Sequence, residues 1–283
     1  MTDTLAHTQR HVVWTGRGMA ASDGAGVKLT RVIGQPALPD LDPFLMLDEF
    51  GSDDPEAYIA GFPDHPHRGF ETVTYMLAGR MRHRDNKGNE GLLTAGSVQW
   101  MTAGRGIVHS EMPEQEQGLM RGFQLWLNLP ARDKMTAPRY QDIAPERIPT
   151  VHPAAGVEAK VIAGEFAGVT GPVEAGATEP FYADFRLAAG AAVEVALTEG
   201  HNAFVYVYEG SAEAGDPAQE LERGTIAVLS PGAAVRLASA AGARLILVAG
   251  KPLREPVAKY GPFVMNTQAE LRQAFADFQS GKF

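Results

Sequence analysis

Three histidines and one glutamate stand in two short motifs whose spacing suits a metal ion. His65 and His67 are two residues apart, and His109 and Glu111 repeat that spacing on a later segment. On an extended strand, residues i and i+2 point to the same face, so the two side chains of each motif can bind the same ion. Two such strands facing each other would bring four ligands to one point. The sequence therefore predicts a metal site formed by His65, His67, His109 and Glu111.

The chemistry of such a site follows from its ligand types. The chain has no cysteine, which excludes disulfides, thiolate ligands and cysteine nucleophiles. Imidazole nitrogen and carboxylate oxygen favour iron, manganese, copper, nickel or catalytic zinc over a structural zinc ion. Three imidazoles and one carboxylate leave coordination positions of an octahedral ion open for substrate or O₂. The ligand set thus indicates a catalytic rather than a structural ion.

The elements that must position these residues read as β-strands. Short apolar segments rich in β-branched and aromatic residues alternate with turn residues, at intervals of about eight to twenty residues, which favours an all-β sandwich or barrel. The segments are 70–79, 97–104, 121–130, 157–166, 193–199, 203–210, 226–232 and 243–250.

The C-terminal end has a different pattern. Thr267 and Glu270 form a capping-box motif, and Leu271, Ala274 and Phe278 follow at helical spacing. We expect an amphipathic helix over 267–280 whose apolar side packs on a domain.

The domain organisation follows from a Pro-rich and charged connection and from a weak repeat. The stretch 130–149 has little periodicity, and strand-glycine patterns at 75–79 and 95–104 recur at 206–210 and 223–232. We predict a metal-carrying barrel over 1–136 and a second barrel with the C-terminal helix over 137–283. The second half contains no H-x-H motif, so we expect no metal there.

Charge and hydropathy exclude several classes of function. The formal net charge is −9 and there is no basic run, which argues against direct nucleic-acid binding. The stretch 1–10 lacks the apolar core of a signal peptide, and no apolar run approaches the roughly 20 residues that span a bilayer. We expect a cytoplasmic protein with no membrane partner.

Three segments of the chain resemble the pirin family of the cupin superfamily. They are 65-HPHRGFET-72, 104-GRGIVHSE-111 and, upstream of both, 42-DPFLMLDEF-50. The resemblance is specific over about residues 30–130 and general in the second half. It implies a bicupin with the metal in its N-terminal barrel. It also implies that His65, His67, His109 and Glu111 occupy the ligand positions and that Fe(II) is the usual ion, with Ni, Cu, Mn and Zn as alternatives.

The general cupin pattern leaves one alternative for the carboxylate ligand. It places a glutamate three or four residues after the H-x-H pair, which would select Glu71, and strand parity with His65 and His67 permits that choice. We favour Glu111 because His109-x-Glu111 forms a same-face pair, and Glu71 would then lie behind the ligands as a hydrogen-bond acceptor.

Several weaker features complete the expectations for the site. Met46, Trp100 and Phe123 are candidates for an apolar pocket over the metal or for plain barrel core. Arg68 is expected to form a salt bridge. His83, which follows the turn at 79–81, is expected to be exposed.

The resemblance implies two functions of different kinds. The first is a quercetin 2,3-dioxygenase-like enzyme that opens a flavonol or related enolic aromatic ring with O₂, with Glu111 as general base. The second is an iron-containing, redox-sensing regulator that binds a protein partner without turnover. A cupin isomerase that uses zinc is a third class. The physiological substrate, the metal and the oligomeric state are not determined by the sequence.

Overall fold

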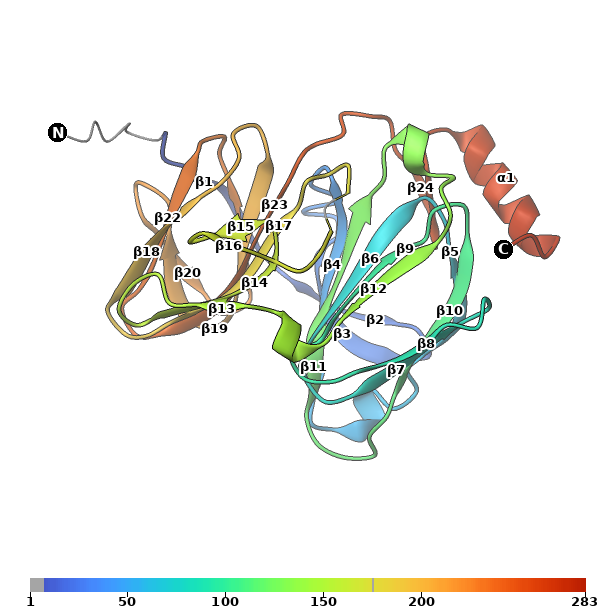
Figure 1. Ribbon diagram of the computed structural model, residues 1–283, viewed down its shortest axis with the longest axis horizontal. Coiled ribbons are helices and arrows are strands. Elements are labelled where there is room, and N and C mark those ends of the chain that lie inside the picture. The colour runs from blue at the N-terminus through green and yellow to red at the C-terminus, as the bar shows by residue number, and fades with distance from the viewer. Residues whose placement is uncertain (1–7, 175) are drawn as a thin grey trace. The chain divides into compact units, whose positions relative to one another are not determined.

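The computed structural model describes residues 8–174 and 176–283, which form two compact β-sheet units (Figure 1). The first unit comprises the chain up to Gly18 together with Ile148–Pro252. The second comprises Met19–Arg147 and Leu253–Phe283, and we call it the histidine unit because it contains His65, His67 and His109. The all-β, two-barrel prediction is confirmed. The expectation that there is no signal peptide rests mostly on residues 1–7, which lie outside the described residues.

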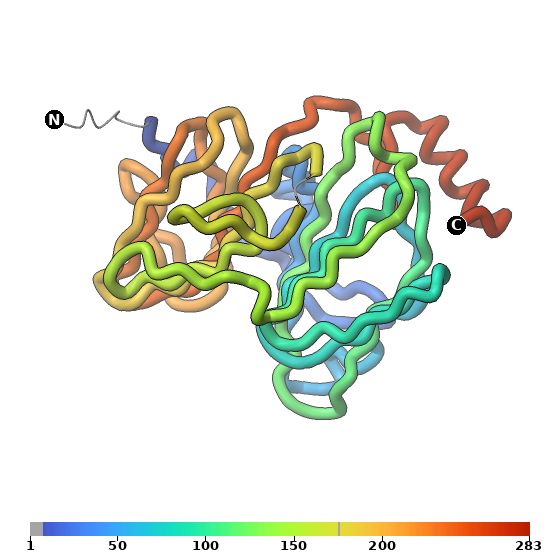
Figure 2. The backbone as a smooth tube through the Cα atoms, viewed as in Figure 1, coloured from blue at the N-terminus to red at the C-terminus, as the bar shows by residue number. Residues whose placement is uncertain are grey.

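The chain order of the units is more complex than a single boundary. The units divide after Arg147, within the connection at 130–149, but Leu253–Phe283 belongs to the histidine unit. Figure 2 traces this return of the C-terminal segment. The domain boundary between residues 136 and 137 stays a prediction. The two compact units are defined by spatial contacts, whereas domains of a family are defined by common descent.

Two antiparallel sheets form the body of the histidine unit. Apolar side chains of both sheets, among them Leu29, Met76 and Met81, pack together in one buried cluster. The large sheet has the strand order β12 (Arg139–Ile143), β9 (Val98–Thr102), β6 (Phe70–Ala78), β11 (Met120–Asn128), β4 (Phe44–Ser52), β3 (Val27–Ile33) and β2 (Met19–Asp23). The small sheet has the order β5 (Phe62–His67), β10 (Ile107–Pro113), β7 (Met81–Asp85) and β8 (Glu90–Leu93).

The C-terminal segment adds a hairpin and a helix to the histidine unit. Thr267 caps helix α1 (Gln268–Gln279), and its reciprocal hydrogen bonds with Glu270 complete the predicted capping box. Leu271 and Ala274 of this helix are buried against Phe263 and Met265. The predicted helix and its apolar contact are therefore confirmed. The hairpin consists of β24 (Ala258–Tyr260) and β25 (Phe263–Met265), and short 3-10 helices lie at η1 (Pro55–Ala57), η2 (Ala131–Asp133) and η3 (Pro145–Arg147).

The first unit is a sheet of antiparallel strands around its own apolar core. Alternating residues of β14 and β17, such as Val157, Ala159 and Phe185, lie in this core, as expected for strands with one buried face. The sheet has the order β1 (Val12–Arg17), β21 (Thr225–Leu229), β19 (Asn202–Ala214), β23 (Ala243–Gly250), β17 (Phe181–Leu187), β14 (Val157–Ala163) and β13 (Thr150–Val151), with β18 (Ala191–Ala196), β22 (Ala234–Ser239) and β20 (Gln219–Glu222) attached. A separate pair is β15 (Glu165–Phe166) with β16 (Val169–Thr170).

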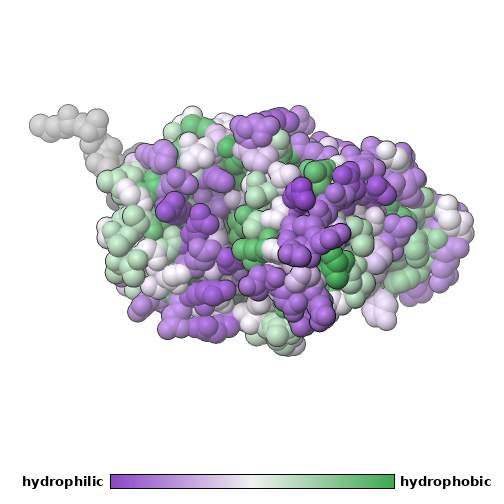
Figure 3. All heavy atoms as spheres, turned by 90° about the horizontal axis from the view of Figure 1, so that it is seen from below, coloured by the Kyte–Doolittle hydropathy of each residue, from purple (hydrophilic) through white to green (hydrophobic). Residues whose placement is uncertain are grey.

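The surface carries no large apolar area on the face drawn in Figure 3, where hydrophobic residues form small patches among hydrophilic ones. The large aliphatic and aromatic side chains lie mainly in the cores of the units. No helix in the described ranges 8–174 and 176–283 is long and apolar enough to cross a membrane.

Candidate metal centre

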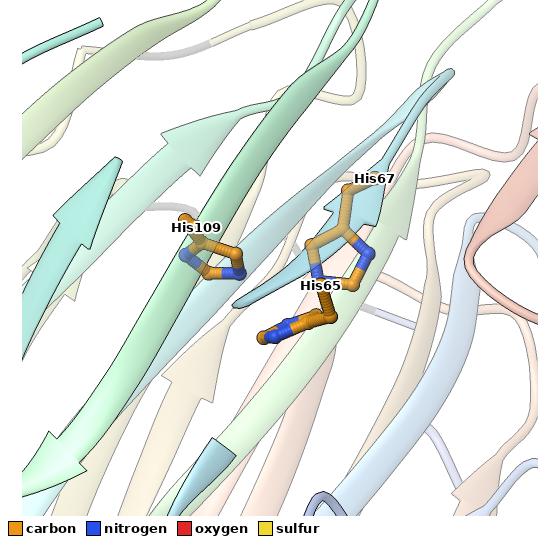
Figure 4. Close-up of side chains that lie close together, drawn as sticks. All are labelled: His65, His67 and His109. Atoms are coloured by element: carbon orange, nitrogen blue, oxygen red, sulfur yellow. The ribbon is translucent and has the colours of Figure 1, made fainter. Parts of the chain in front are cut away.

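Adjacent strands of the small sheet bring the three histidines together. His109 of β10 lies directly opposite His65 of β5, and Ile107 lies opposite His67. The imidazole centroids of His65 and His109 are 4.4 Å apart, and those of His67 and His109 are 5.0 Å apart. One ring nitrogen from each histidine lies within 4.8 Å of the others. The rings converge on a common space, as Figure 4 shows.

The environment of these rings fits a metal ion. Both ring nitrogens of His109 are buried and have no hydrogen-bond partner in the described part of the chain, whereas buried polar atoms are normally bonded. Burial holds the pKa values of His67 and His109 well below their usual range, so these rings stay neutral, as ligands must. His65 Nδ1 lies 2.8 Å from the Pro63 carbonyl oxygen. If Nδ1 carries the proton and donates there, Nε2 is free to bind an ion.

Glu111 lies two residues beyond His109 on β10, and the regular pairing of both residues with β7 places them on one face of the sheet. The pairing with β5 is irregular between them. The group whose ligand atoms lie within 4.8 Å of one another contains the three histidines and not Glu111. The Thr74 hydroxyl lies 2.9 Å from Glu111 Oε1, and Gln124 Nε2 donates to Oε2 over 3.4 Å. Burial raises the pKa of this carboxyl, while the nearby His65 lowers it. A buried carboxylate needs a compensating charge, which a divalent ion at the triad would provide. The assignment of Glu111 as fourth ligand stays a prediction.

The turn between β5 and β6 is fixed by the C-terminal segment. Gly69 has a φ of +90°, and a Cβ at this position would lie 1.9 Å from the Val264 carbonyl oxygen. Arg68 donates from Nη1 to Asp277 over 2.8 Å and from Nε to the Arg105 carbonyl over 2.6 Å. The predicted salt bridge of Arg68 is therefore present. These contacts hold the residue next to His67 and the turn that precedes β10.

A buried lysine reinforces the same turn. Lys134 is 1% exposed and donates from Nζ to the carbonyl oxygens of Gly69 and Val264 and to Asn128 Oδ1. Burial lowers its pKa to about 8. The sequence gives no sign of this role, because Lys134 stands within the charged connection that reads as solvent-exposed.

His65, His67 and Glu111 line a cavity of about 810 Å³ in the histidine unit, and His109 lies behind its lining. Trp126 gives the lining an aromatic side chain. Its ring centroid lies 5.2 Å from that of His67 and 4.3 Å from that of the buried Phe70. Lys259 and Tyr260 of the C-terminal hairpin also line the cavity. Its size suits a ligand of several rings.

Some of the residues proposed for the pocket from sequence line it and others do not. Met46 is a lining residue, whereas Trp100 and Phe123 are buried and are not among the lining residues. Trp126, Thr74 and Gln124 were missed. These residues face the cavity from β11 and β6, and the pairing of the two strands brings them to the site. The register of that pairing cannot be read from one sequence.

The expectation that His83 is exposed is wrong. This side chain is fully buried, and it lies directly opposite Glu111 in the pairing of β7 with β10. Its ring centroid lies 5.0 Å from that of Tyr140, with the two rings tilted, and Nε2 lies 3.6 Å from Asp142 Oδ2. Odd-numbered positions of β7 point inward, and the turn before the strand does not alter that alternation.

The even spacing that allowed Glu71 to share a strand face with His65 and His67 does not hold, because Gly69 interrupts the strand. Strand β5 ends at His67 and β6 begins at Phe70, so the i, i+2 rule does not carry across the turn. Thr74 faces the cavity, and Glu71, an odd number of residues away on the same strand, faces the other side. Glu71 accepts a hydrogen bond of 2.6 Å from the Thr102 hydroxyl, and burial raises its pKa.

Family models match both halves of the chain. The model described as Pirin matches residues 26–127, which include the two ligand motifs, and the model described as Pirin C-terminal cupin domain matches residues 182–283. The chain belongs to the pirin family. The sequence resemblance was general in the second half, and the second model extends the family membership over it.

Individual relatives agree with this membership. A Pseudomonas aeruginosa protein, named provisionally as a quercetin 2,3-dioxygenase, is 54% identical over 96% of this chain and 97% of its own length. A pirin-like protein of Caulobacter vibrioides is 51% identical over 97% of this chain and 99% of its own. The crystal structure of a quercetin 2,3-dioxygenase from Acinetobacter baumannii matches with a TM-score of 0.90 at 35% identity, and the match covers 97% of this chain and 98% of that one.

Proposed function

We propose that this pirin-family chain is a metal-dependent dioxygenase that acts on a flavonol-type, quercetin-like substrate or a related enolic aromatic compound. The observation that carries the proposal is the convergence of His65, His67 and His109 beside a buried carboxylate, at a cavity of about 810 Å³. The name of the Acinetobacter baumannii relative, whose structure matches along nearly the whole chain, supports the reaction type.

The residues proposed to hold the ion are His65, His67, His109 and Glu111, and the ion expected is Fe(II). When bound, such an ion supplies Lewis-acid polarisation of a substrate oxygen and an open position for O₂. Nitrogen and oxygen ligands alone do not select iron over nickel, copper, manganese or zinc, so the metal is part of the proposal.

Glu111 is the group proposed to accept a proton. Its carboxyl is buried in the lining of the cavity, where a positioned carboxylate can act as a general base on a bound substrate. Thr74 and Gln124 contact its two oxygens and so fix the direction of the lone pairs. The enolic hydroxyl of a flavonol would transfer its proton to this carboxylate, which leaves an electron-rich ring for attack by O₂.

The cavity walls orient the ring system. Trp126 lines the cavity beside His67 with Phe70 packed behind it at a tilt, and Met46 adds an apolar lining residue. A flat aromatic compound gains both burial and stacking against such a wall. The wall therefore favours planar substrates over aliphatic ones.

The test is turnover of quercetin by protein that has been reconstituted with Fe(II) under anaerobic conditions. After addition of O₂, the expected result is O₂ uptake with release of carbon monoxide in equal amounts and loss of the flavonol absorbance. A His152→Ala variant serves as control, since this exposed histidine lies in the first unit. Iron-loaded protein that consumes no O₂ with any flavonol or enolic aromatic compound would overturn the proposal.

A further inference from the structure

A row of polar side chains crosses the large sheet along one wall of the cavity. Arg31 of β3, Asp48 of β4, Gln124 of β11 and Thr74 of β6 are direct neighbours in successive strand pairs. Directly opposite residues share a face of the sheet, and all four line the cavity. Thr74 contacts Glu111, so the row leads from the proposed catalytic carboxylate to Arg31.

Apolar rows lie on both sides of this polar row. Met46 is opposite Trp126 on one side, and Leu29 is opposite Phe50 on the other. All of these side chains line the cavity. The wall is therefore a polar stripe between two apolar ones, which suits an aromatic ring system that carries polar groups along its length.

The far end of the row is a fixed cluster of three charged groups. Arg31 donates from Nε and Nη2 to the two oxygens of Asp48 over 2.9 and 2.7 Å, and from Nη2 to Asp23 Oδ2 over 2.9 Å. The side chain of Asp48 is 3% exposed, whereas those of Arg31 and Asp23 are 24% and 50% exposed. Arg31 and Asp23 are therefore accessible to a ligand in the cavity, whereas the buried Asp48 positions the guanidinium.

The charge of this cluster selects the kind of group it can bind. One guanidinium and two carboxylates give it a net charge of −1. Lys259, whose charge interacts with that of Arg31, and the acid Asp64 also line the cavity and offset each other, so the sum stays at −1. A further carboxylate, on a ligand, would be repelled by this cluster. A neutral hydroxyl both donates and accepts, and it can therefore donate to Asp23 while it accepts from Arg31.

The distance along the sheet sets the length of the ligand. Neighbouring strands are about 4.8 Å apart, so the three steps from β6 to β3 separate Thr74 from Arg31 by about 14 Å. A single aromatic ring held at the histidines does not reach the cluster. A second ring system is needed to carry the hydroxyl group there.

We propose that Asp23 and Arg31 determine substrate specificity by binding uncharged hydroxyl groups on the distal ring of a multi-ring aromatic substrate. The inference rests on the proposed function for the placement of the proximal ring at the histidines. It adds that the enzyme selects neutral polyphenols and rejects substrates with an acidic group at the distal end.

The experiment measures binding without turnover, on metal-loaded protein in the absence of O₂. Quenching of tryptophan fluorescence reports the Kd, because Trp126 lines the cavity. Three ligands are compared. The first is quercetin, the second is the same flavonol without hydroxyl groups on the distal ring, and the third is the same flavonol with a carboxylate on that ring. The variant is Asp23→Ala, and Asp53→Ala is the matched control, since Asp53 is an exposed acid outside the lining. Arg31→Gln tests the donor, with Tm measured to verify folding.

The wild-type protein should bind quercetin about tenfold more tightly than the unsubstituted flavonol, the effect of one or two hydrogen bonds. Asp23→Ala and Arg31→Gln should each reduce this ratio to about threefold or less, since each removes one partner, and Asp53→Ala should leave it unchanged. Asp23→Ala should also improve binding of the carboxylated flavonol relative to wild type.

Four other outcomes bear on the two proposals separately. A ratio that is unchanged in Asp23→Ala, or a wild-type protein that binds the carboxylated flavonol most tightly, overturns the specificity inference even if carbon monoxide is released in the turnover assay. Hydroxyl-dependent binding without O₂ uptake supports the recognition site and contradicts the reaction. Absence of binding of all three flavonols overturns the specificity inference, and O₂ uptake with other enolic aromatic compounds then decides the proposed function.

Discussion

Arg68 Nη1 donates to Asp277 Oδ2 over 2.8 Å and so ties helix α1 to the residue that follows His67. The guanidinium is 4% exposed and also lies over the Phe283 ring at 4.3 Å. The C-terminal segment is therefore part of the scaffold of the metal centre.

Asp277→Asn should lower both the Tm and the affinity for metal. The change removes the charge that compensates the buried guanidinium of Arg68, and an uncompensated buried charge destabilises the fold. Thermal unfolding and anaerobic metal titration measure the two effects. Glu116→Gln, at an exposed acid, is the control. Wild-type values of Tm and metal affinity in Asp277→Asn would show that α1 does not support the site.

Gly69→Ala should cost far more stability than Gly88→Ala. Both glycines have nearly the same φ, +90° and +89°, but a Cβ at Gly88 meets nothing within 4 Å, whereas at Gly69 it meets the Val264 carbonyl oxygen. The backbone cost common to both is about 1 kcal/mol, and the clash should raise the cost at Gly69 to about 3 kcal/mol. Denaturant unfolding separates the two effects. Equal losses would mean that the C-terminal segment moves aside freely.

Lys134 should make stability rise with pH in the alkaline range. Its pKa is about 8 in the folded protein because of burial, against a usual value of 10.5. Between these values the unfolded chain binds more protons, so the free energy of unfolding increases with pH by up to about 3 kcal/mol. Lys134→Met should lack this increase and be less stable at pH 7, since three acceptors lose their donor. Parallel curves for the two proteins between pH 8 and 10.5 would contradict the assignment.

The sequence was sufficient for features that depend on local pattern. The helix at 268–279 follows from Thr267, Glu270 and the spacing of Leu271 and Ala274. The approach of His65, His67 and His109 follows from strand alternation within each motif. These features depend on residues close in the chain, where periodicity and capping chemistry determine the structure.

Features that depend on long-range register could not be obtained in this way. The Glu71 alternative assumed one continuous strand, but the turn at Gly69 breaks the alternation. His83 was assigned to the surface because its pairing with Glu111 is not visible in the sequence. The lining residue Tyr260 lies far along the chain from the histidine motifs, and only the folded structure shows that its hairpin belongs to the histidine unit.

Glu111→Gln should lower kcat while it leaves the KM for quercetin nearly unchanged. The amide keeps the shape and can still contact Thr74 and Gln124, but it cannot accept the substrate proton, and loss of a general base costs roughly 10²–10⁴-fold in rate. Steady-state kinetics with O₂ detection measures both constants, on samples matched for bound iron because Glu111 is also a proposed ligand. Glu71→Gln is the matched control at a buried carboxyl on the other face of β6, and it should retain activity. A larger loss of kcat in Glu71→Gln than in Glu111→Gln would reverse the assignment of the two carboxylates.

The most direct test of the metal centre is a titration of Fe(II) into the metal-free protein without O₂, with quercetin turnover measured on each sample. We predict that activity increases in proportion to bound iron and reaches its maximum at one equivalent. A His109→Ala variant should bind no iron and show no turnover, while His152→Ala should match the wild type. Full activity in the metal-free protein, or in a His109→Ala protein that contains no metal, would contradict the account.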